Sequence, residues 1–187
     1  KRIPTPWVNR GKDNLKRFLQ PGILSTQNIA VSSSTDKADI RFSTSFSHQR
    51  GIVPNTKLDA FNFNTTIGYN FSPKLRFETN INYNRQNTPN FPDVQYGPNS
   101  MIYNVIIWGG ADWNVDDMRN YWQPGKEWVQ QIYAEYQRYN NPWFLAKEWL
   151  RGHQKNDVYG YASLKYKLTK DIEILGRTNV TTYDLFR

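Results

Sequence analysis

The chain has 187 residues, of which 38% are hydrophobic and 16% aromatic, and it carries a formal net charge of +8. No stretch approaches the roughly 18 consecutive apolar residues that a membrane-spanning helix needs, so a helical membrane protein is excluded. The lack of cysteine excludes a disulfide framework and any Cys-based zinc or redox site. The Lys and Arg residues are scattered rather than clustered, so we expect no nucleic-acid partner.

Residues 1–26 are polar and rich in Pro and Gly, and they are predicted to form an extracellular loop segment. Within them, residues 13–19 predict a short helix with Asp13 as its N-cap and Phe18 on its apolar side. The start of the chain has no apolar stretch of the kind found in a signal peptide. We therefore expect the chain to be a piece of a longer polypeptide.

Residues 27–86 alternate apolar and polar side chains, and a period of two predicts β-strands. Strands are expected over 27–33 and 39–49, followed by a loop over 51–56. The clearest element is a hairpin over 60–84 that turns at Ser72-Pro73-Lys74. Its apolar positions are Phe61, Phe63, Thr65, Ile67, Tyr69, Phe71, Leu75, Phe77, Thr79, Ile81 and Tyr83.

An apolar outer face, aromatic residues near the strand ends and a polar inner face are typical of transmembrane β-barrels. A half-exposed sheet of a soluble protein gives the same alternation, so the interpretation depends on whether the pattern repeats. Residues 157–187 do repeat it, as a truncated barrel hairpin with a turn at 169–171.

Between these blocks, residues 87–156 lose the alternation and are predicted to form one long extracellular loop. Residues 127–139 in this loop predict a helix from the spacing of Trp128, Ile132, Tyr133 and Tyr136. Short turns lie within the predicted hairpins and longer connections lie between them, as in barrels whose two ends differ. The sequence thus predicts an all-β fold, an antiparallel transmembrane β-barrel segment of about six strands.

Several segments in order give the sequence a family resemblance. They are AVSSSTDKADIRFSTSFSHQRGIVPNT at 30–56, the hairpin at 70–85, Ile107-Trp108 and the YNNPWF segment at 139–144. With this order and spacing, the chain resembles the SusC/RagA family of TonB-dependent outer-membrane transporters of Bacteroidota.

The resemblance implies that the chain is a share of a roughly 22-stranded barrel filled by a plug. It also implies location in the cell outer membrane, contact with outer-membrane lipid, and import of glycans or oligopeptides. The implied partners are a SusD-like surface lipoprotein and TonB, the latter through parts outside this chain. No catalytic motif occurs, so we expect neither enzymatic activity nor a cofactor.

The tryptophans of the long loop are candidate contacts for a ligand or for the lid lipoprotein, because Trp dominates interface hot spots. The alternative is that they form a local core that holds the loop in shape. These residues are Trp108, Trp113, Trp122, Trp128, Trp143 and Trp149.

Charged residues on the polar positions of the predicted strands are candidate lumen-facing residues that line the plug contact or the solute path. They are Arg41, Arg76, Glu78, Lys165, Lys167 and Arg177.

Residues 112–117 begin like a calcium-binding loop, but Asp117 stands where an EF-hand needs Gly and Gln123 where it needs Glu. An EF-hand is rejected, and a looser calcium site stays an alternative. His48 and His153 have no partner motif, so no metal site is predicted.

A second function from another class fits the same features. A soluble β-rich carbohydrate-binding module could use the Trp-rich loop as a platform for sugar rings. Detergent dependence separates this module from the transporter.

Overall fold

The structure is a computed structural model that describes residues 3–4, 6–93, 95–131 and 138–187. Strands make up 51% and helices 12% of the chain, which confirms the all-β prediction. The chain forms two compact units. The first takes in the N-terminal stretch up to Ile23, Arg50–Lys57 and Pro89–Gly152; the second takes in Leu24–Gln49, Leu58–Thr88 and His153–Arg187.

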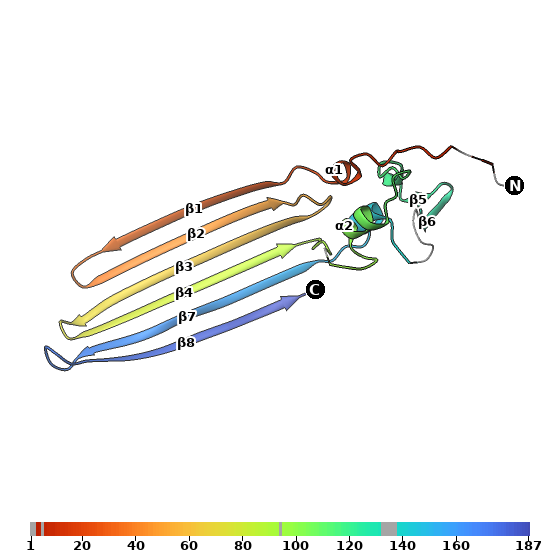
Figure 1. Cartoon of the computed structure of the whole chain (residues 1–187). Helices are drawn as coiled ribbons and strands as arrows, with labels where there is room; N and C mark the ends of the chain where they lie inside the picture. The colour runs from red at the N-terminus through yellow and green to blue at the C-terminus, as the bar shows by residue number, and fades with distance from the viewer. Residues whose placement is uncertain (1–2, 5, 94, 132–137) are drawn as a thin grey trace. The chain divides into compact units, whose positions relative to one another are not determined.

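The second unit is a six-stranded sheet in the order β1-β2-β3-β4-β7-β8 (Figure 1). The strands are β1 (Ile23–Ser34), β2 (Ala38–Arg50), β3 (Lys57–Ser72), β4 (Leu75–Thr88), β7 (His153–Lys167) and β8 (Glu173–Phe186). Each predicted strand is present, and β4 pairs antiparallel with β7 although residues 89–152 separate them in sequence.

The three tight turns of the sheet lie at the same end of the strands in Figure 1, and each is closed by a side-chain hydroxyl. Thr35 Oγ1 accepts the backbone N–H of Ala38 at 3.0 Å. Ser72 Oγ accepts from Lys74 and Leu75, and Thr169 Oγ1 accepts from Asp171 and Ile172. Ser and Thr satisfy turn backbones in this way, so the local sequence fixes where each strand reverses.

The strand register gives the sheet two chemically distinct faces. Phe63 pairs with Tyr83, which pairs with Val158, so the apolar positions of β3, β4 and β7 share one face. Phe42 of β2 joins this face, because its ring stacks on Phe63 with centroids 6.4 Å apart. Asn64 pairs with Asn82 on the opposite face. We call these the apolar face and the polar face.

The first unit contains short elements around a core of its own. They are α1 (Asn14–Phe18), α2 (Met101–Tyr103), the π-helix Asn104–Trp108, the 3-10 helix Asp117–Arg119, the hairpin strands β5 (Trp122–Gln123) and β6 (Lys126–Gln130), and α3 (Pro142–Lys147). None of the helices in the described ranges has the length and apolarity needed to cross a membrane.

The core of the first unit draws on three separate stretches of the chain. Phe18 comes from α1, Val53 from the loop after β2, and the other buried members from residues 89–152. Phe18 meets the edge of the Trp143 ring with centroids 4.9 Å apart. The long insertion is therefore a folded unit, and the N-terminal stretch and residues 51–56 belong to it.

The short helix predicted over 13–19 is confirmed as α1, but two details of the helix predictions need correction. Asp13 stands before α1 but makes no side-chain cap, because its backbone is left-handed with φ 57°. The helix expected over 127–139 is wrong at its start, where β6 forms instead; residues 132–137 lie outside the described part. The cause is a tight turn at Pro124-Gly125, where Gly125 has φ 71° and folds β6 back on β5.

Truncation of the core should loosen the first unit. Leu145 is 1% exposed in the core, whereas Leu150 is 53% exposed. We expect Leu145→Ala to cost about 2–5 kcal/mol of stability, since a buried Leu leaves a cavity. Limited proteolysis of residues 89–152 should accelerate in Leu145→Ala but not in the control Leu150→Ala. Equal proteolysis of the two variants would contradict the assigned core.

Candidate functional site

The six candidate tryptophans divide into buried and exposed residues. Trp143 is 7% exposed in the core, where its Nε1 donates to the Val115 carbonyl at 2.7 Å. Trp113 is partly buried against the same core. For these two the alternative role, a local core, fits the structure.

The other four lie nearer the surface of the first unit. Trp108 stacks on Tyr139 with centroids 4.3 Å apart, and Trp122 packs between Phe144 and Trp128. Trp128 and Trp149 are 78% and 50% exposed, so they remain the available contacts. Three further exposed aromatics of the first unit, Trp7, Phe91 and Tyr96, were not among the candidates; their places in Pro- or Gly-containing segments were the available signal.

Arginine side chains bind the carboxylates of Asp116 and Asp117 in the acidic loop at 112–117. Arg17 Nη1 lies 2.9 Å from Asp116 Oδ2, and Arg10 Nη2 lies 2.5 Å from Asp117 Oδ2. Arg119 Nε donates to the other carboxylate oxygen of Asp116, Oδ1, at 2.8 Å. In the described part of the chain no group of three His, Cys, Asp or Glu side chains could hold a metal. The carboxylates thus link α1 to the 3-10 helix.

A tyrosine–carboxylate pair joins the 3-10 helix region to the end of α3. Tyr121 donates its hydroxyl to Glu148 Oε1 at 2.6 Å. This hydrogen bond holds the proton on the phenol and raises the pKa of Tyr121, and burial adds to the effect. The raised pKa favours the folded state below the ordinary tyrosine pKa of about 10, and that contribution is lost as pH rises through the folded pKa.

This pair can be tested by titration of the phenol. We expect Glu148→Gln to lower the pKa of Tyr121, because the charged acceptor is removed. The measurement is the absorbance titration near 295 nm, with Tyr121→Phe as the blank that isolates this phenol. An unchanged pKa in Glu148→Gln would show that Tyr121 and Glu148 do not interact.

On the sheet, the six charged candidates share the polar face. Glu78 pairs with Gly68 and with Ser163, and Ser163 pairs with Arg177, so these positions form one row across the strands. Arg76 pairs with Lys165, and Lys167 pairs with Glu173. Arg41 has the same parity on β2 as Asp39, which bonds to Arg76 across β3.

Arg76 of β4 is held in place by groups from two other strands. Its Nη2 lies 2.7 Å from Asp39 Oδ1 of β2, and its Nη1 donates to Asn70 Oδ1 of β3 at 3.3 Å. The ion pair passes directly over Gly68, where an added Cβ would collide with Arg76 Nη2 and stand 2.6 Å from the Asp39 carboxylate oxygens. Because residue 68 of β3 is a glycine, there is room for the ion pair between Asp39 of β2 and Arg76 of β4.

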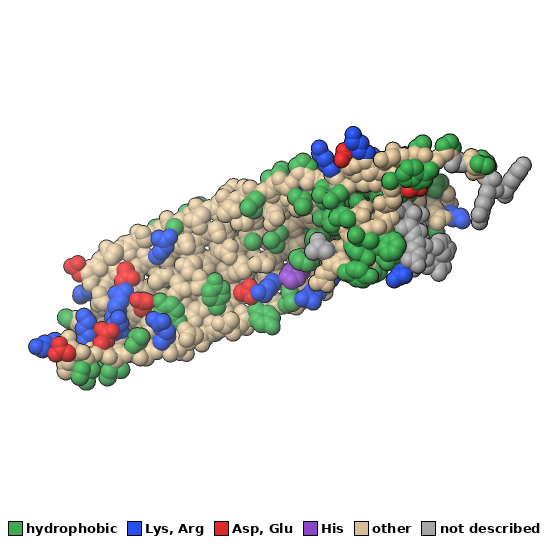
Figure 2. All heavy atoms as spheres, in the orientation of Figure 1, with side chains coloured by type: hydrophobic (Ala, Val, Ile, Leu, Met, Phe, Trp, Pro, Cys, Tyr) green, Lys and Arg blue, Asp and Glu red, His purple; other side chains and the backbone are tan. Residues whose placement is uncertain are grey.

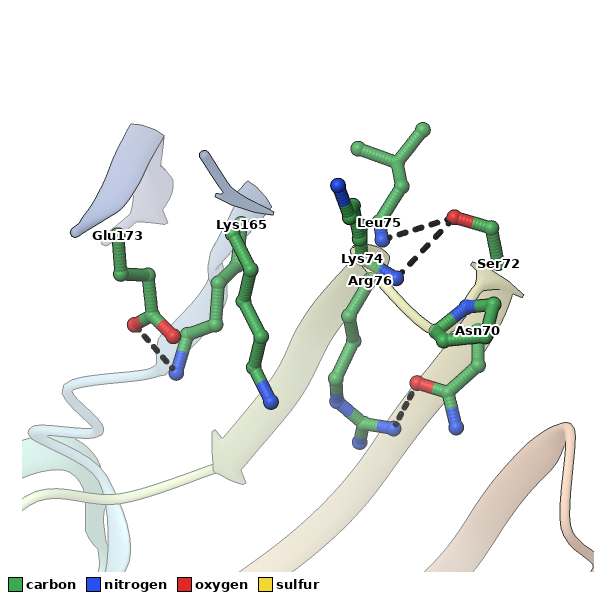
Figure 3. A pocket seen from close by; sticks show the side chains of 9 residues that line it. Asn70, Ser72, Lys74, Leu75, Arg76, Lys165 and Glu173 are labelled. Carbon is green, nitrogen blue, oxygen red and sulfur yellow. Dashed lines mark hydrogen bonds and ion pairs between the residues drawn. The ribbon is translucent and has the colours of Figure 1, made fainter. Parts of the chain in front are cut away.

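The network continues across β7 to β8. Tyr161 donates its hydroxyl to Glu78 Oε1 at 2.5 Å, and the Arg177 guanidinium lies 4.6 Å from the Tyr161 ring centroid. Lys165 Nζ lies 3.2 Å from Glu173 Oε1. Figure 3 shows Arg76, Lys165 and Glu173 pointing the same way, into a pocket of about 240 Å³ at the turn end of the sheet.

Charge is concentrated at this turn end. Figure 2 shows Lys, Arg, Asp and Glu gathered over the end of the sheet that carries the tight turns, while its middle is largely uncharged. In the middle, amides bond to one another: Asn64 donates to Asn82, and Asn82 and Asn80 continue the chain to Thr66. The side chains of the polar face are therefore held by contacts within the sheet: ion pairs near the tight turns and amide hydrogen bonds in the middle.

The two histidines take separate positions. His48 Nδ1 lies 2.5 Å from Asp59 Oδ1, near the end of the sheet away from the tight turns. His153 begins β7 opposite Thr88. Neither approaches a second histidine in the register, so the sheet brings no catalytic or metal-binding pair together at these positions.

The role of Gly68 gives a prediction about the ion pair. A double-mutant cycle of Asp39→Asn and Arg76→Gln should yield a coupling of up to about 1 kcal/mol, as for part-exposed pairs. In a Gly68→Ala background the coupling should fall to zero, because the methyl group occupies the crossing point. The free energy of unfolding measures both cycles, and undiminished coupling in the Ala background would refute the crossing.

A scan of this chain against known protein families finds no match, and a search of curated proteins finds none either.

Proposed function

We propose that the second unit is part of the wall of an outer-membrane β-barrel, and that this barrel is a TonB-dependent importer of glycans or oligopeptides. The observation that carries the membrane proposal is a band without charge on the apolar face. On β3 it runs from Phe61 to Phe71, and on β4 from Leu75 to Tyr83. On β7 it runs from Val158 to Tyr166, and on β8 from Ile174 to Thr182.

The length of the band suits a membrane. On β4, β7 and β8 the band spans eight residue steps, which give about 20 Å of height at 3.3 Å per residue and a tilt of about 40°. On β3 it spans ten steps, which give roughly 33 Å along the strand and about 25 Å of height. That is the height of the apolar band of outer-membrane barrels.

The apolar side chains of the sheet do not pack into a hydrophobic core. In the described chain, every hydrophobic residue that is fully buried belongs to the first unit, while Ile29, Phe46 and Val180 of the sheet are 46–68% exposed. An apolar surface of this extent requires a partner. Lipid is a partner that needs only alternate residues to be apolar, because strands satisfy their backbone groups between themselves.

The importer class rests on the sequence resemblance and on the folded insertion. A SusD-like lipoprotein over the loops would use exposed aromatics such as Trp128 and Trp149. TonB would act through parts outside this chain. The polar face would line the lumen.

The carbohydrate-binding module remains the second candidate, because Trp128 is 78% exposed beside Trp122, with ring centroids 5.7 Å apart. Such a pair can stack on a sugar ring. This reading needs a second layer of protein over the apolar face.

Extraction of the polypeptide that contains this chain separates the two candidates. A barrel should require detergent and should migrate differently on SDS gels before and after heating. Recovery in the aqueous fraction without detergent would overturn the membrane proposal. Copurification of a surface lipoprotein, lost on deletion of residues 89–152, tests the importer class.

Paired arginine substitutions test the face assignment. Phe42 and Ser43 are neighbours near the middle of β2, with Phe42 on the apolar face and Ser43 on the parity of Ser45, which accepts a hydrogen bond from Asn62. We expect Phe42→Arg to cost about 2–4 kcal/mol, as for Arg at the bilayer midplane, and Ser43→Arg to cost much less. Refolding into lipid vesicles under urea gives both values, and equal costs would refute the assignment.

A further inference from the structure

Two pairs of cations lie next to each other at the turn end of the polar face. Arg76 of β4 pairs with Lys165 of β7 in the strand register. Toward the turn, the backbone N–H of Lys167 donates to the carbonyl of Lys74 at 2.9 Å, so these two residues are also neighbours. Like charges at opposite positions of neighbouring strands destabilise a sheet. The two pairs therefore cost stability unless negative groups lie beside them.

Carboxylates of the sheet balance the first pair. Asp39 Oδ1 lies 2.7 Å and Glu78 Oε2 lies 3.8 Å from Arg76 Nη2. Glu173 Oε1 lies 3.2 Å from Lys165 Nζ. Arg76 and Lys165 thus have acidic partners on β2, β4 and β8.

The second pair, Lys74 and Lys167, has no such partner. In the part of the chain that the structure describes, neither lysine takes part in an ion pair, and both are exposed. Glu173 stands opposite Lys167 in the register, but its carboxylate binds Lys165. Two positive charges on neighbouring strands therefore remain unbalanced.

The acids of the two flanking tight turns do not supply the missing charge. Asp36 is followed by Lys37, and Asp171 is preceded by Lys170, so each of these turns is formally neutral. The Asp36 turn leads into β2, which lies two strand spacings, about 10 Å, from β4. Asp171 lies two residues, about 7 Å, beyond the level of Lys167 in the register. Neither acid lines the pocket beside the unbalanced lysines.

That pocket, of about 240 Å³, is the one in Figure 3, and the unbalanced lysines line it together with Arg76, Lys165 and Ser72. Ser72 Oγ accepts two backbone N–H groups of the turn, which leaves its own hydrogen for an acceptor in the pocket. Pockets for drug-sized ligands have volumes of about 300–1,000 Å³, so this one suits a smaller molecule. Its lining offers ammonium, guanidinium and hydroxyl donors.

We propose that this pocket binds a phosphate dianion, either the free ion or the phosphate group of a small molecule. A phosphate monoester carries a charge of about −1.5 to −2 at pH 7 and three strong acceptor oxygens. It therefore matches the charge of Lys74 and Lys167 and can also accept the Ser72 hydroxyl. A carboxylate or a sulfate ester carries one negative charge and would balance one lysine only. The site goes beyond the proposed importer, because its residues lie within the sheet whether or not lipid covers the apolar face.

Calorimetric titration of the complete polypeptide with inorganic phosphate tests the site. We expect saturable binding of phosphate and weaker binding of acetate, which has a single charge. Lys167→Gln should weaken phosphate binding about tenfold, because a charge-assisted hydrogen bond is lost. The matched control Lys170→Gln removes the same charge from a tight turn outside the pocket and should leave the affinity unchanged. A parallel titration with glucose 6-phosphate separates the two sources of phosphate: tighter binding assigns the pocket to an organic phosphate, and equal or weaker binding to the free ion.

Three results would overturn the inference. They are no saturable binding of phosphate, acetate bound as tightly as phosphate, and equal affinities of the Lys167→Gln and Lys170→Gln variants. Far-ultraviolet circular dichroism shows that each variant keeps its strands. All three results leave the barrel wall untouched, since the need for detergent tests it separately.

Discussion

Cross-strand register is the constraint on which the sheet depends. Because side chains alternate with a period of two, a slip of one residue in any strand would carry its charges onto the apolar face. Three hydroxyls oppose such a slip, since Thr35, Ser72 and Thr169 accept hydrogen bonds from the backbone N–H groups of the tight turns through their side chains. Correct register then lines up side chains from several strands into rows across the sheet. The Asp39–Arg76 contact over Gly68 exists only when β2, β3 and β4 are aligned.

The two units meet the need to bury apolar surface in different ways. The first builds a small core from Phe18, Val53 and residues of the insertion, and links its helices through arginine–carboxylate pairs. The sheet leaves its apolar face exposed and puts its specific contacts on the polar face. In the proposed account this difference has one cause: lipid takes the place of a core, so the sheet's sequence is free to make its other face ordered and charged.

The strands could be predicted because their signal is local: alternation and turn hydroxyls are readable within ten or so residues. The lumen-facing candidates follow from the same parity. The first unit could not be predicted, because its core joins Phe18, Val53 and Val115, which lie far apart in sequence. Trp143 and Trp128 both lie in the predicted long loop, yet one is buried and the other exposed.

The central claim is that alternate residues of the sheet face lipid and water. The 187 residues contain no cysteine, so single cysteines can be introduced along β3 from residue 60 to 71 and spin-labelled. Collision with oxygen, which concentrates in lipid, should peak at odd positions. Collision with a water-soluble nickel chelate should peak at even positions, with a period of two. Water access at both parities, or a pattern without that period, would contradict the account.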